Sequence, residues 1–210
     1  MNIDILIQAR LNSKRFPRKV LAEVGGARLI RYLLTSMAKV TQARHVVVLV
    51  PWADKDLIEA VWPWPVWVGD EDDVASRFVE YVENNDCDGF VRVCGDSPLL
   101  DWRIVNTMIH LFRTGDRLLV SNVGGGFPHG QQCEVVRSGF FLENKDRLDR
   151  EHVIPTLYHF TVPWIHRGRG PVEPSLVVDT PADFERIKRV IERANYQPWA
   201  HPYQELQAWA

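Results

Sequence analysis

Short runs of consecutive apolar residues alternate along the chain with longer stretches whose apolar positions recur at helical spacing. The short runs have the length and content of strands buried on both faces, and they lie at residues 3–7, 45–50, 66–68, 89–93, 118–121, 133–136 and 175–178. The helical patterns lie at residues 27–40, 54–61, 74–85, 101–112, 149–160 and 180–194. This alternation predicts an α/β fold in which most strands are parallel.

A strongly basic loop follows the first predicted strand. Between that strand and the next acid, Glu23, the loop carries the cations Arg10, Lys14, Arg15, Arg18 and Lys19. In open α/β sheets ligands bind beyond the carboxyl ends of the strands, so cations gathered there indicate a polyanion such as a phosphate chain. The loop has no glycine before Gly25 and matches neither a P-loop nor a dinucleotide-binding fingerprint. A solvated surface loop is the equally open alternative.

Two aspartates stand at the carboxyl ends of other predicted strands. Asp96 comes one residue after Gly95, beyond the strand at 89–93, and Asp179 follows the strand at 175–178. The next helix begins with a threonine cap and a proline, so Asp179 has no capping role. Two carboxylates beside a cationic loop are the groups that magnesium-dependent nucleotidyl transfer requires. A turn-forming role for Asp96 stays open, and so does the distance between the two acids.

The bulk composition limits the classes of protein. At 210 residues, 46% hydrophobic and 25% charged, the chain is typical of a globular protein with an adequate core. A net charge of −2 argues against a general nucleic-acid binder, because phosphate-backbone affinity needs a broad cationic face. The three cysteines have neither disulfide nor zinc-site spacing. The chain opens on a strand and has no apolar run near the ~20 residues of a membrane span, so we expect a cytoplasmic protein without membrane contacts.

Three stretches of the chain resemble the signature motifs of one enzyme family. They are IQARLNSKRFPRKVL at 7–21, VCGDSPLLD at 93–101 and VDTPADFERI at 178–187. The family is the cytidylyltransferases, which include the CMP-Kdo and acylneuraminate synthetases, and the resemblance is closest to the spore coat polysaccharide biosynthesis branch. The shorter stretches SNV, PHGQQCEV and REHVIP are similar to features of that branch.

The resemblance implies a fold, a reaction and partners. The fold would be a single Rossmann-like nucleotidyltransferase domain over residues 1–210, with a mostly parallel mixed sheet and helices on both faces. Residues 122–175 would form the acceptor loop and a dimer contact, so that the protein is a homodimer. The reaction would move CMP from CTP to a sugar or sugar-acid acceptor with release of pyrophosphate, with Mg²⁺ as cofactor, in surface polysaccharide or glycan synthesis.

The resemblance also assigns site residues. The catalytic residues would be Arg10, Lys19, Asp96 and Asp179, and the two aspartates would be the metal ligands. The nucleotide would be bound by Ala9, Arg10, Ser13, Arg15, Lys19, Cys94 and Asp96. Two alternatives stay open: a nucleotide-sugar-dependent glycosyltransferase, which would release no pyrophosphate, and a non-catalytic nucleotide-binding module.

Five further polar residues are candidates for contacts with the acceptor. Arg77 lies near the start of the helix at 74–85, where strand ends gather, and an exposed surface charge is its alternative reading. The other candidates are Asn122 and Glu134, at the two ends of the glycine-rich loop, and Glu151 and His152, near the start of the helix predicted at 149–160. Asn122 stands shortly before three consecutive glycines, and flexible loops beside a site often close over a substrate. A tolerated surface insertion explains a glycine run equally well.

Overall fold

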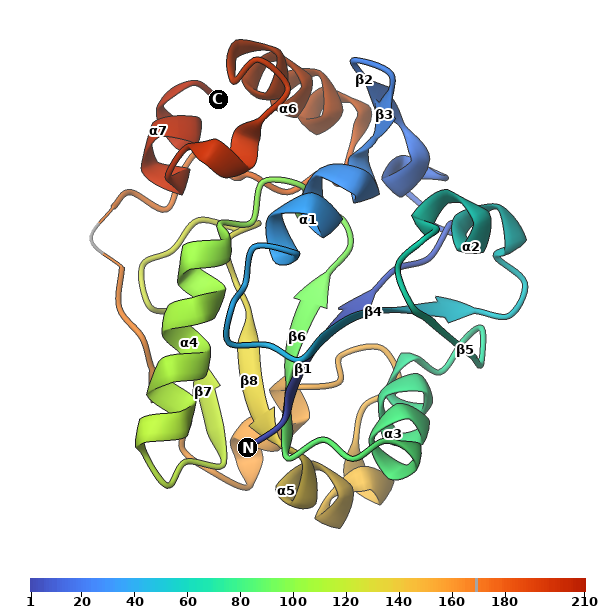
Figure 1. Ribbon diagram of the computed structural model, residues 1–210, viewed down its shortest axis with the longest axis vertical. Coiled ribbons are helices and arrows are strands. Elements are labelled where there is room, and N and C mark those ends of the chain that lie inside the picture. Colours follow the sequence, from blue (N-terminus) through green and yellow to red (C-terminus); the bar gives the residue numbers. More distant parts are fainter. Residues whose placement is uncertain (169) are drawn as a thin grey trace.

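A seven-stranded sheet runs through the middle of the molecule in a computed structural model that describes residues 1–168 and 170–210 (Figure 1). The strand order is β5-β4-β1-β6-β8-β7-β9. The strands are β1 (Ile3–Gln8), β4 (His45–Pro51), β5 (Val66–Gly69), β6 (Gly89–Cys94), β7 (Leu119–Ser121), β8 (Glu134–Arg137) and β9 (Trp164–Ile165). The first four in this order are parallel, β8 is antiparallel to both its neighbours, and β9 is parallel to β7. The predicted mostly parallel, mixed sheet is confirmed.

Helices cover both faces of this sheet (Figure 1). They are α1 (Leu29–Met37), α2 (Lys55–Val61), α3 (Val74–Asn84), α4 (Trp102–Thr114), α5 (Ser138–Glu143), α6 (Pro181–Arg193) and α7 (Tyr203–Ala208). On β1, Ile5 and Ile7 belong to the hydrophobic core with α1, α2 and α4, whereas Leu6 belongs to the core with α3 and α5. All three side chains are fully buried, because both faces of this parallel strand are covered. The α/β fold with helices on both faces is therefore confirmed.

A third hydrophobic cluster joins the C-terminal helices to the exit of the basic loop. In it, α6 and α7 pack with the short hairpin of β2 (Glu23–Val24) and β3 (Ala27–Arg28). Gly25 and Gly26 form the turn of this hairpin with positive φ, and a Cβ on Gly25 would collide with the ring of Tyr196. The cluster therefore holds the chain in place where it leaves the basic loop.

The strand predicted at residues 175–178 is wrong. This segment pairs with no strand of the described sheet and makes isolated backbone hydrogen bonds, from Leu176 N to His129 O at 2.7 Å and from Val178 N to Asp96 O at 2.9 Å. The side chains of Leu176 and Val178 are buried in the cluster around α6. A short apolar run indicates burial, and here the burial is against a helix instead of within a sheet.

The helix predicted at residues 149–160 is also wrong. Only a short 3-10 helix forms there, η3 (Pro155–His159). It is preceded by a turn in which the Asp149 carboxylate accepts the backbone N–H groups of Glu151 and His152. Pro155 has no N–H group and its ring clashes with the preceding turn, so it can begin a helix but does not fit inside one.

Several short elements have no clear sequence pattern. The helices α5 and α7 have 6 residues each, which is too few for a periodic signal, and β9 has 2. Residue 169, inside the predicted acceptor and dimer region at 122–175, lies outside the described residues.

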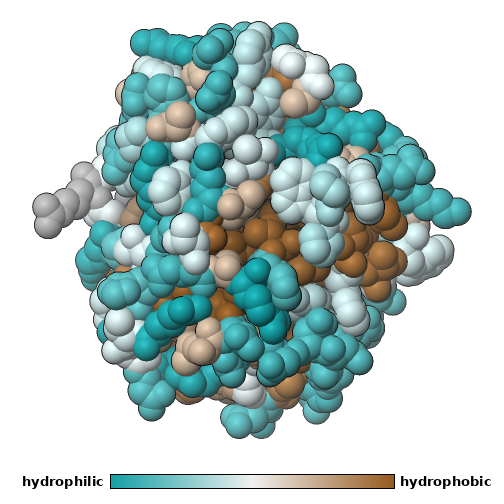
Figure 2. Space-filling model, in the orientation of Figure 1, coloured by the Kyte–Doolittle hydropathy of each residue, from teal (hydrophilic) through white to brown (hydrophobic). Residues whose placement is uncertain are grey.

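Within the described part of the chain, no helix is long and apolar enough to cross a bilayer. In Figure 2 the surface is mostly hydrophilic, and apolar residues show in a hollow near the centre of the face.

Candidate active site

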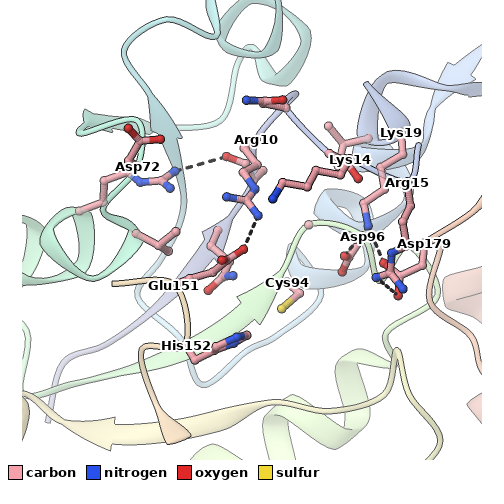
Figure 3. Close-up of a pocket in the computed structure, with 18 of the residues that line it drawn as sticks. Arg10, Lys14, Arg15, Lys19, Asp72, Cys94, Asp96, Glu151, His152 and Asp179 are labelled. Carbon is pink, nitrogen blue, oxygen red and sulfur yellow. Dashed lines mark hydrogen bonds and ion pairs between the residues drawn. The ribbon is translucent and has the colours of Figure 1, made fainter. Parts of the chain in front are cut away.

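A cleft of about 590 Å³ opens where the carboxyl ends of β1 and β6 meet the basic loop (Figure 3). Its walls also include the start of α3, the turn before η3 and the segment that leads into α6. This is where ligands bind in open α/β sheets. The structure gathers here all the predicted catalytic and nucleotide-binding residues, which are Ala9, Arg10, Ser13, Arg15, Lys19, Cys94, Asp96 and Asp179.

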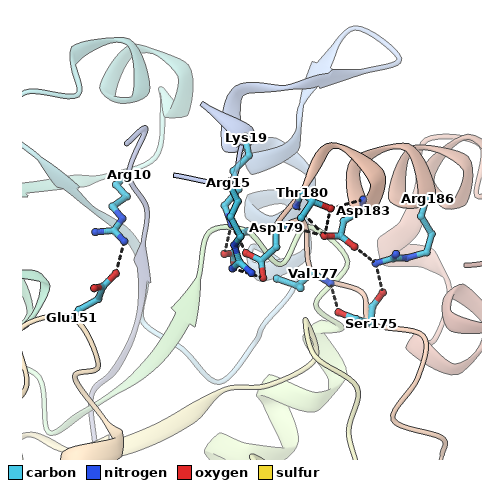
Figure 4. Close-up of polar contacts among 11 residues, drawn as sticks. Arg10, Arg15, Lys19, Glu151, Ser175, Val177, Asp179, Thr180, Asp183 and Arg186 are labelled. Atoms are coloured by element: carbon cyan, nitrogen blue, oxygen red, sulfur yellow. Dashed lines mark hydrogen bonds and ion pairs between the residues drawn. The ribbon is translucent and has the colours of Figure 1, made fainter. Parts of the chain in front are cut away.

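The ammonium group of Lys19 joins the two aspartates. Its Nζ lies 2.8 Å from Oδ2 of Asp96 and 2.9 Å from Oδ1 of Asp179. Arg15 pairs with the other oxygen of Asp179 at 2.9 Å (Figure 4). Burial alone would lower the pKa of Lys19, but the two carboxylates outweigh burial and raise it above its ordinary value. The sequence left the distance between the two acids open, and the structure brings them to one cation.

The start of α2 fixes the shape of the basic loop. Arg18 has a left-handed backbone conformation with φ 60°, and its N–H donates to the carbonyl of Leu11 at 2.9 Å. The Asp54 carboxylate accepts the N–H of Leu11 at 2.7 Å, and Asp56 pairs with the guanidinium of Arg18 at 2.6 Å. Both ends of the loop are thereby tied to α2, and the residue after Arg18, Lys19, points into the cleft.

Asp179 is held from both sides. The N–H of Val178 donates to the backbone carbonyl of Asp96 at 2.9 Å, which joins this segment to the end of β6. On the other side, Thr180 and Asp183 form a reciprocal capping box at the start of α6 (Figure 4). The predicted helix start is confirmed, and Asp179 reaches the cleft without belonging to the sheet.

Asp96 and Asp179 fit a Mg²⁺ ion. Their side chains are 25% and 28% exposed and present hard oxygen donors to the same cation position, where Lys19 now lies. Among the described residues, no group of three or more His, Cys, Asp and Glu side chains could hold a metal by itself. The remaining ligands would be phosphate oxygens and water, which is the usual arrangement for Mg²⁺.

Another wall of the cleft carries an exposed ion pair. Arg10 pairs with Glu151 at 2.5 Å, and the two side chains are 41% and 56% exposed (Figure 3). Glu151 and His152 both line the cleft, because the Asp149 carboxylate folds the turn that carries them. Exposed ion pairs are weak, so an anionic ligand can compete with Glu151 for Arg10.

Arg77 is buried, so the surface-charge alternative is wrong. The residue is 1% exposed, lines the cleft and makes long hydrogen bonds from Nη1 to the carbonyls of Ala9 and Leu49, at 3.5 and 3.4 Å. Among the residues that the structure describes, its Nε and Nη2 find no hydrogen-bond partner. Burial, followed by the nearby charge of Arg10, lowers the pKa of Arg77. These two nitrogens, Nε and Nη2, are solvent-inaccessible, so a ligand would reach them only after neighbouring groups moved.

The other two predicted acceptor contacts lie outside the cleft lining. Asn122 donates to the carbonyl of Gln131 and accepts the N–H of Cys133, both at 2.8 Å, and so holds its own loop together. Glu134 is buried behind Arg92, which does line the cleft and which the sequence analysis missed. The signal was available, because Arg92 is the only charge inside the apolar run at residues 89–93.

Cys94 lines the cleft as a neutral thiol. Burial raises its pKa to about 12, so it is not a nucleophile at neutral pH. Its contact with a nucleotide would be a packing contact.

Known proteins resemble this chain over most of its length. The family profile described as cytidylyltransferase matches residues 5–197. The spore coat polysaccharide biosynthesis protein SpsF of Bacillus subtilis is 28% identical over 94% of this chain and 89% of its own length. A 3-deoxy-manno-octulosonate cytidylyltransferase of Chlorobium luteolum is 27% identical over 82% of this chain and 66% of its own length.

Solved structures share the fold. A cytidylyltransferase from Leptospira borgpetersenii has a TM-score of 0.85 at 26% identity, with 92% of this chain and 87% of that chain covered. A CMP:2-keto-3-deoxy-manno-octonic acid synthetase complexed with CTP has a TM-score of 0.72 at 18% identity, with 92% and 100% covered, a likeness of fold alone. Since the family profile spans nearly the whole chain, this protein belongs to the cytidylyltransferase family.

Proposed function

We propose that this protein moves CMP from CTP to a sugar or sugar-acid acceptor and releases pyrophosphate, in the synthesis of a surface polysaccharide or glycan. The observation that carries the proposal is the convergence of Asp96, Asp179 and Lys19 in the cleft, next to Arg15. Membership of the cytidylyltransferase family supports CTP as the nucleotide. The names of SpsF and of the octulosonate cytidylyltransferase support the sugar-like acceptor and the pathway class.

The basic loop would bind the triphosphate of CTP. Arg10, Ser13, Arg15 and Lys19 line this part of the cleft, and cations there stabilise the charge that develops on the leaving pyrophosphate. An acceptor hydroxyl oxygen attacks the α-phosphorus in line and forms the new P–O bond. The bond from the α-phosphorus to the bridging oxygen breaks, its electron pair leaves with pyrophosphate, and the hydroxyl proton passes to water.

A bound Mg²⁺ would neutralise and align the phosphate oxygens. Asp96 and Asp179 are the residues that would hold it. Lys19 already keeps the two carboxylates within hydrogen-bond distance of one point, so the pair needs little rearrangement to share an ion.

The acceptor would bind beyond Cys94. Arg77, Glu151 and His152 line the cleft and are placed to contact it. Asn122 and Glu134 do not line the cleft, and direct acceptor contact by either stays a prediction that the geometry does not support.

The homodimer and the cytoplasmic location likewise stay predictions. Light scattering would test the homodimer, and cell fractionation would test the location.

A pyrophosphate-release assay tests the proposal. Each of ATP, CTP, GTP and UTP is combined with keto-sugar acids, sugar phosphates and neutral keto-sugars, with Mg²⁺ and with EDTA. We expect release with CTP in the presence of Mg²⁺ and a loss of release with EDTA. A glycosyltransferase would release no pyrophosphate, and a non-catalytic module would bind CTP in a thermal-shift assay without turnover. Either of these results contradicts the proposal.

A further inference from the structure

Arg92 is a charged residue inside a buried strand, and both neighbouring strands hold its guanidinium. On β1, the side-chain oxygen of Gln8 accepts a hydrogen bond from Nε of Arg92 at 3.0 Å. On β8, Glu134 is the direct register partner of Arg92, and its Oε2 lies 3.6 Å from Nη1. The Arg92 side chain is 19% exposed and lines the cleft two residues before Cys94. The sheet therefore presents a fixed guanidinium to the cleft.

Glu134 is held in turn from the far side. Its Oε1 accepts a hydrogen bond from the hydroxyl of Tyr158 at 3.4 Å, and that hydroxyl lies 3.0 Å from Oγ of Ser121. Phe90 lies on the same face of the sheet, two residues before Arg92, and belongs to a hydrophobic core. A polar row thus runs from Gln8 to Ser121 beside apolar residues of the same face, Leu6 and Phe90 among them. Such a row costs desolvation energy and calls for an explanation.

The pairing of Arg92 with protein groups is incomplete. The 3.6 Å separation from Glu134 is longer than a hydrogen bond, and Oε2 of Glu134 has no hydrogen-bond partner within residues 1–168 and 170–210. In the described part of the chain, the terminal nitrogens of Arg92 also have no hydrogen-bond partner. A guanidinium fixed at Nε, with its terminal N–H groups free, can bind a carboxylate or a phosphate through two parallel hydrogen bonds.

The position of Arg92 matches the acceptor end of the cleft. It lies four residues before Asp96, which is at most roughly 13 Å of extended chain, with Cys94 between them. Lys19 and Arg15 gather at the Asp96 end, where the triphosphate would bind. An acceptor whose hydroxyl reaches the α-phosphate would extend from there along β6 toward Arg92.

We infer that Arg92 binds an anionic group of the acceptor, a carboxylate or a phosphate, and that Glu134 is the positioning residue that holds Arg92. This inference rests on the proposed function and narrows its acceptor class. Glu134 would affect acceptor binding only by positioning Arg92, and would not contact the acceptor itself. A neutral acceptor would leave the terminal N–H groups of the guanidinium without a hydrogen-bond acceptor in a partly buried site, and would therefore bind weakly.

Variants at these two positions test the inference through the KM values of the two substrates. Arg92→Gln should raise the KM of an anionic acceptor by about 100-fold and change the KM of CTP by less than about 3-fold. Arg92→Lys keeps the charge but loses the planar fork, and an increase of about 10-fold in acceptor KM is expected. Glu134→Gln should raise the acceptor KM by about 10-fold while kcat at saturating acceptor stays within about 3-fold. Sugar acids, sugar phosphates and neutral sugars of equal chain length identify which anion is bound.

Arg44→Gln is the matched control. Arg44 pairs with the buried Asp4 at 2.7 Å near the amino ends of β1 and β4, outside the cleft lining. The Arg44→Gln substitution should lower the melting temperature and leave the KM values of CTP and of the acceptor unchanged. The inference is overturned if Arg92→Gln behaves like this control or raises the two KM values equally; if Arg92→Gln does not fold, Arg92→Lys decides by the same criteria.

The outcome for the wild-type enzyme separates the two proposals. If the wild type releases pyrophosphate and prefers neutral sugars, the inference about Arg92 fails while the proposed function stands. If it releases no pyrophosphate with any acceptor, the proposed function fails and the inference fails with it.

Discussion

Asp96 and Asp179 bond the same ammonium group, Nζ of Lys19, at 2.8 and 2.9 Å. Asp96 follows the central strand β6 and Asp179 precedes α6, so this contact joins the parallel sheet to the C-terminal part of the chain. The Lys19 cation neutralises part of the negative charge that the two carboxylates bring to one point. The charge balance at this point therefore decides what the cleft can bind.

Replacing either aspartate by asparagine should remove most turnover and leave the fold intact. The amide keeps the size of the side chain but loses the charge that a magnesium ligand needs, so kcat should fall by at least about 100-fold. Pyrophosphate release measures turnover, and thermal melting checks the fold. The matched control is Asp116→Asn, which alters a fully exposed aspartate paired with Arg137 outside the cleft. Unchanged pyrophosphate release in Asp96→Asn and Asp179→Asn would rule out the metal assignment.

Removing the Asp54 carboxylate should weaken the binding of CTP and leave the binding of the acceptor unchanged. Asp54 accepts the N–H of Leu11 at 2.7 Å in a partly buried contact, and the loss of such a bond costs about 1–3 kcal/mol. Asp54→Ala should therefore raise the KM of CTP by about 10-fold. Asp56→Asn removes only an exposed pair with Arg18 and should change this KM by less than about 3-fold. Equal KM values for Asp54→Ala and wild type would show that the loop does not depend on this contact.

Local sequence signals were sufficient for the parallel sheet and for most helix starts. The run through Ile5, Leu6 and Ile7 predicts a strand covered on both faces, and the structure buries these residues in two separate cores. Asp101 and Thr180 predict helix starts, and both side chains accept a backbone N–H there. These signals are local, because a cap or a buried strand depends mainly on its near neighbours in sequence.

The site itself depends on contacts that no local pattern encodes. Lys19 reaches both acids because Arg18 takes a left-handed conformation and because the Val178 N–H bonds to the carbonyl of Asp96. The burial of Arg77 depends on its fit beneath the ends of β1 and β4, which the helical pattern of α3 does not reveal. Strand-end position and motif resemblance together indicated Arg10, Lys19, Asp96 and Asp179 but missed Arg92, and only the fold shows which of these residues meet.

Glu151→Gln should tighten CTP binding, because it removes a competitor for Arg10. The Arg10–Glu151 pair is exposed and worth less than about 1 kcal/mol, so the Kd of CTP should fall by about 3-fold. Isothermal titration calorimetry at two salt concentrations measures the effect, which should shrink at high salt. Lys145 pairs with Glu83 outside the cleft, and Glu83→Gln serves as the matched control. A weaker Kd in Glu151→Gln would instead indicate that Glu151 supports the nucleotide site.

Cys94 should react slowly with electrophiles although it lines the cleft. With burial raising its pKa to about 12, only about one thiol in 10⁴ is ionised at pH 8. A raised pKa moves ionisation to higher pH, so the labelling rate with iodoacetamide should climb about tenfold per pH unit between pH 7 and 9.5. Mass spectrometry resolves the labelling of Cys94 from that of Cys87 and Cys133. The Cys94→Ser variant should keep its turnover within about 3-fold of the wild-type value, because a neutral thiol takes no part in the proposed transfer. A labelling rate that levels off near pH 9 would show an ordinary thiol, and the cleft would then be wetter around Cys94 than its packing indicates.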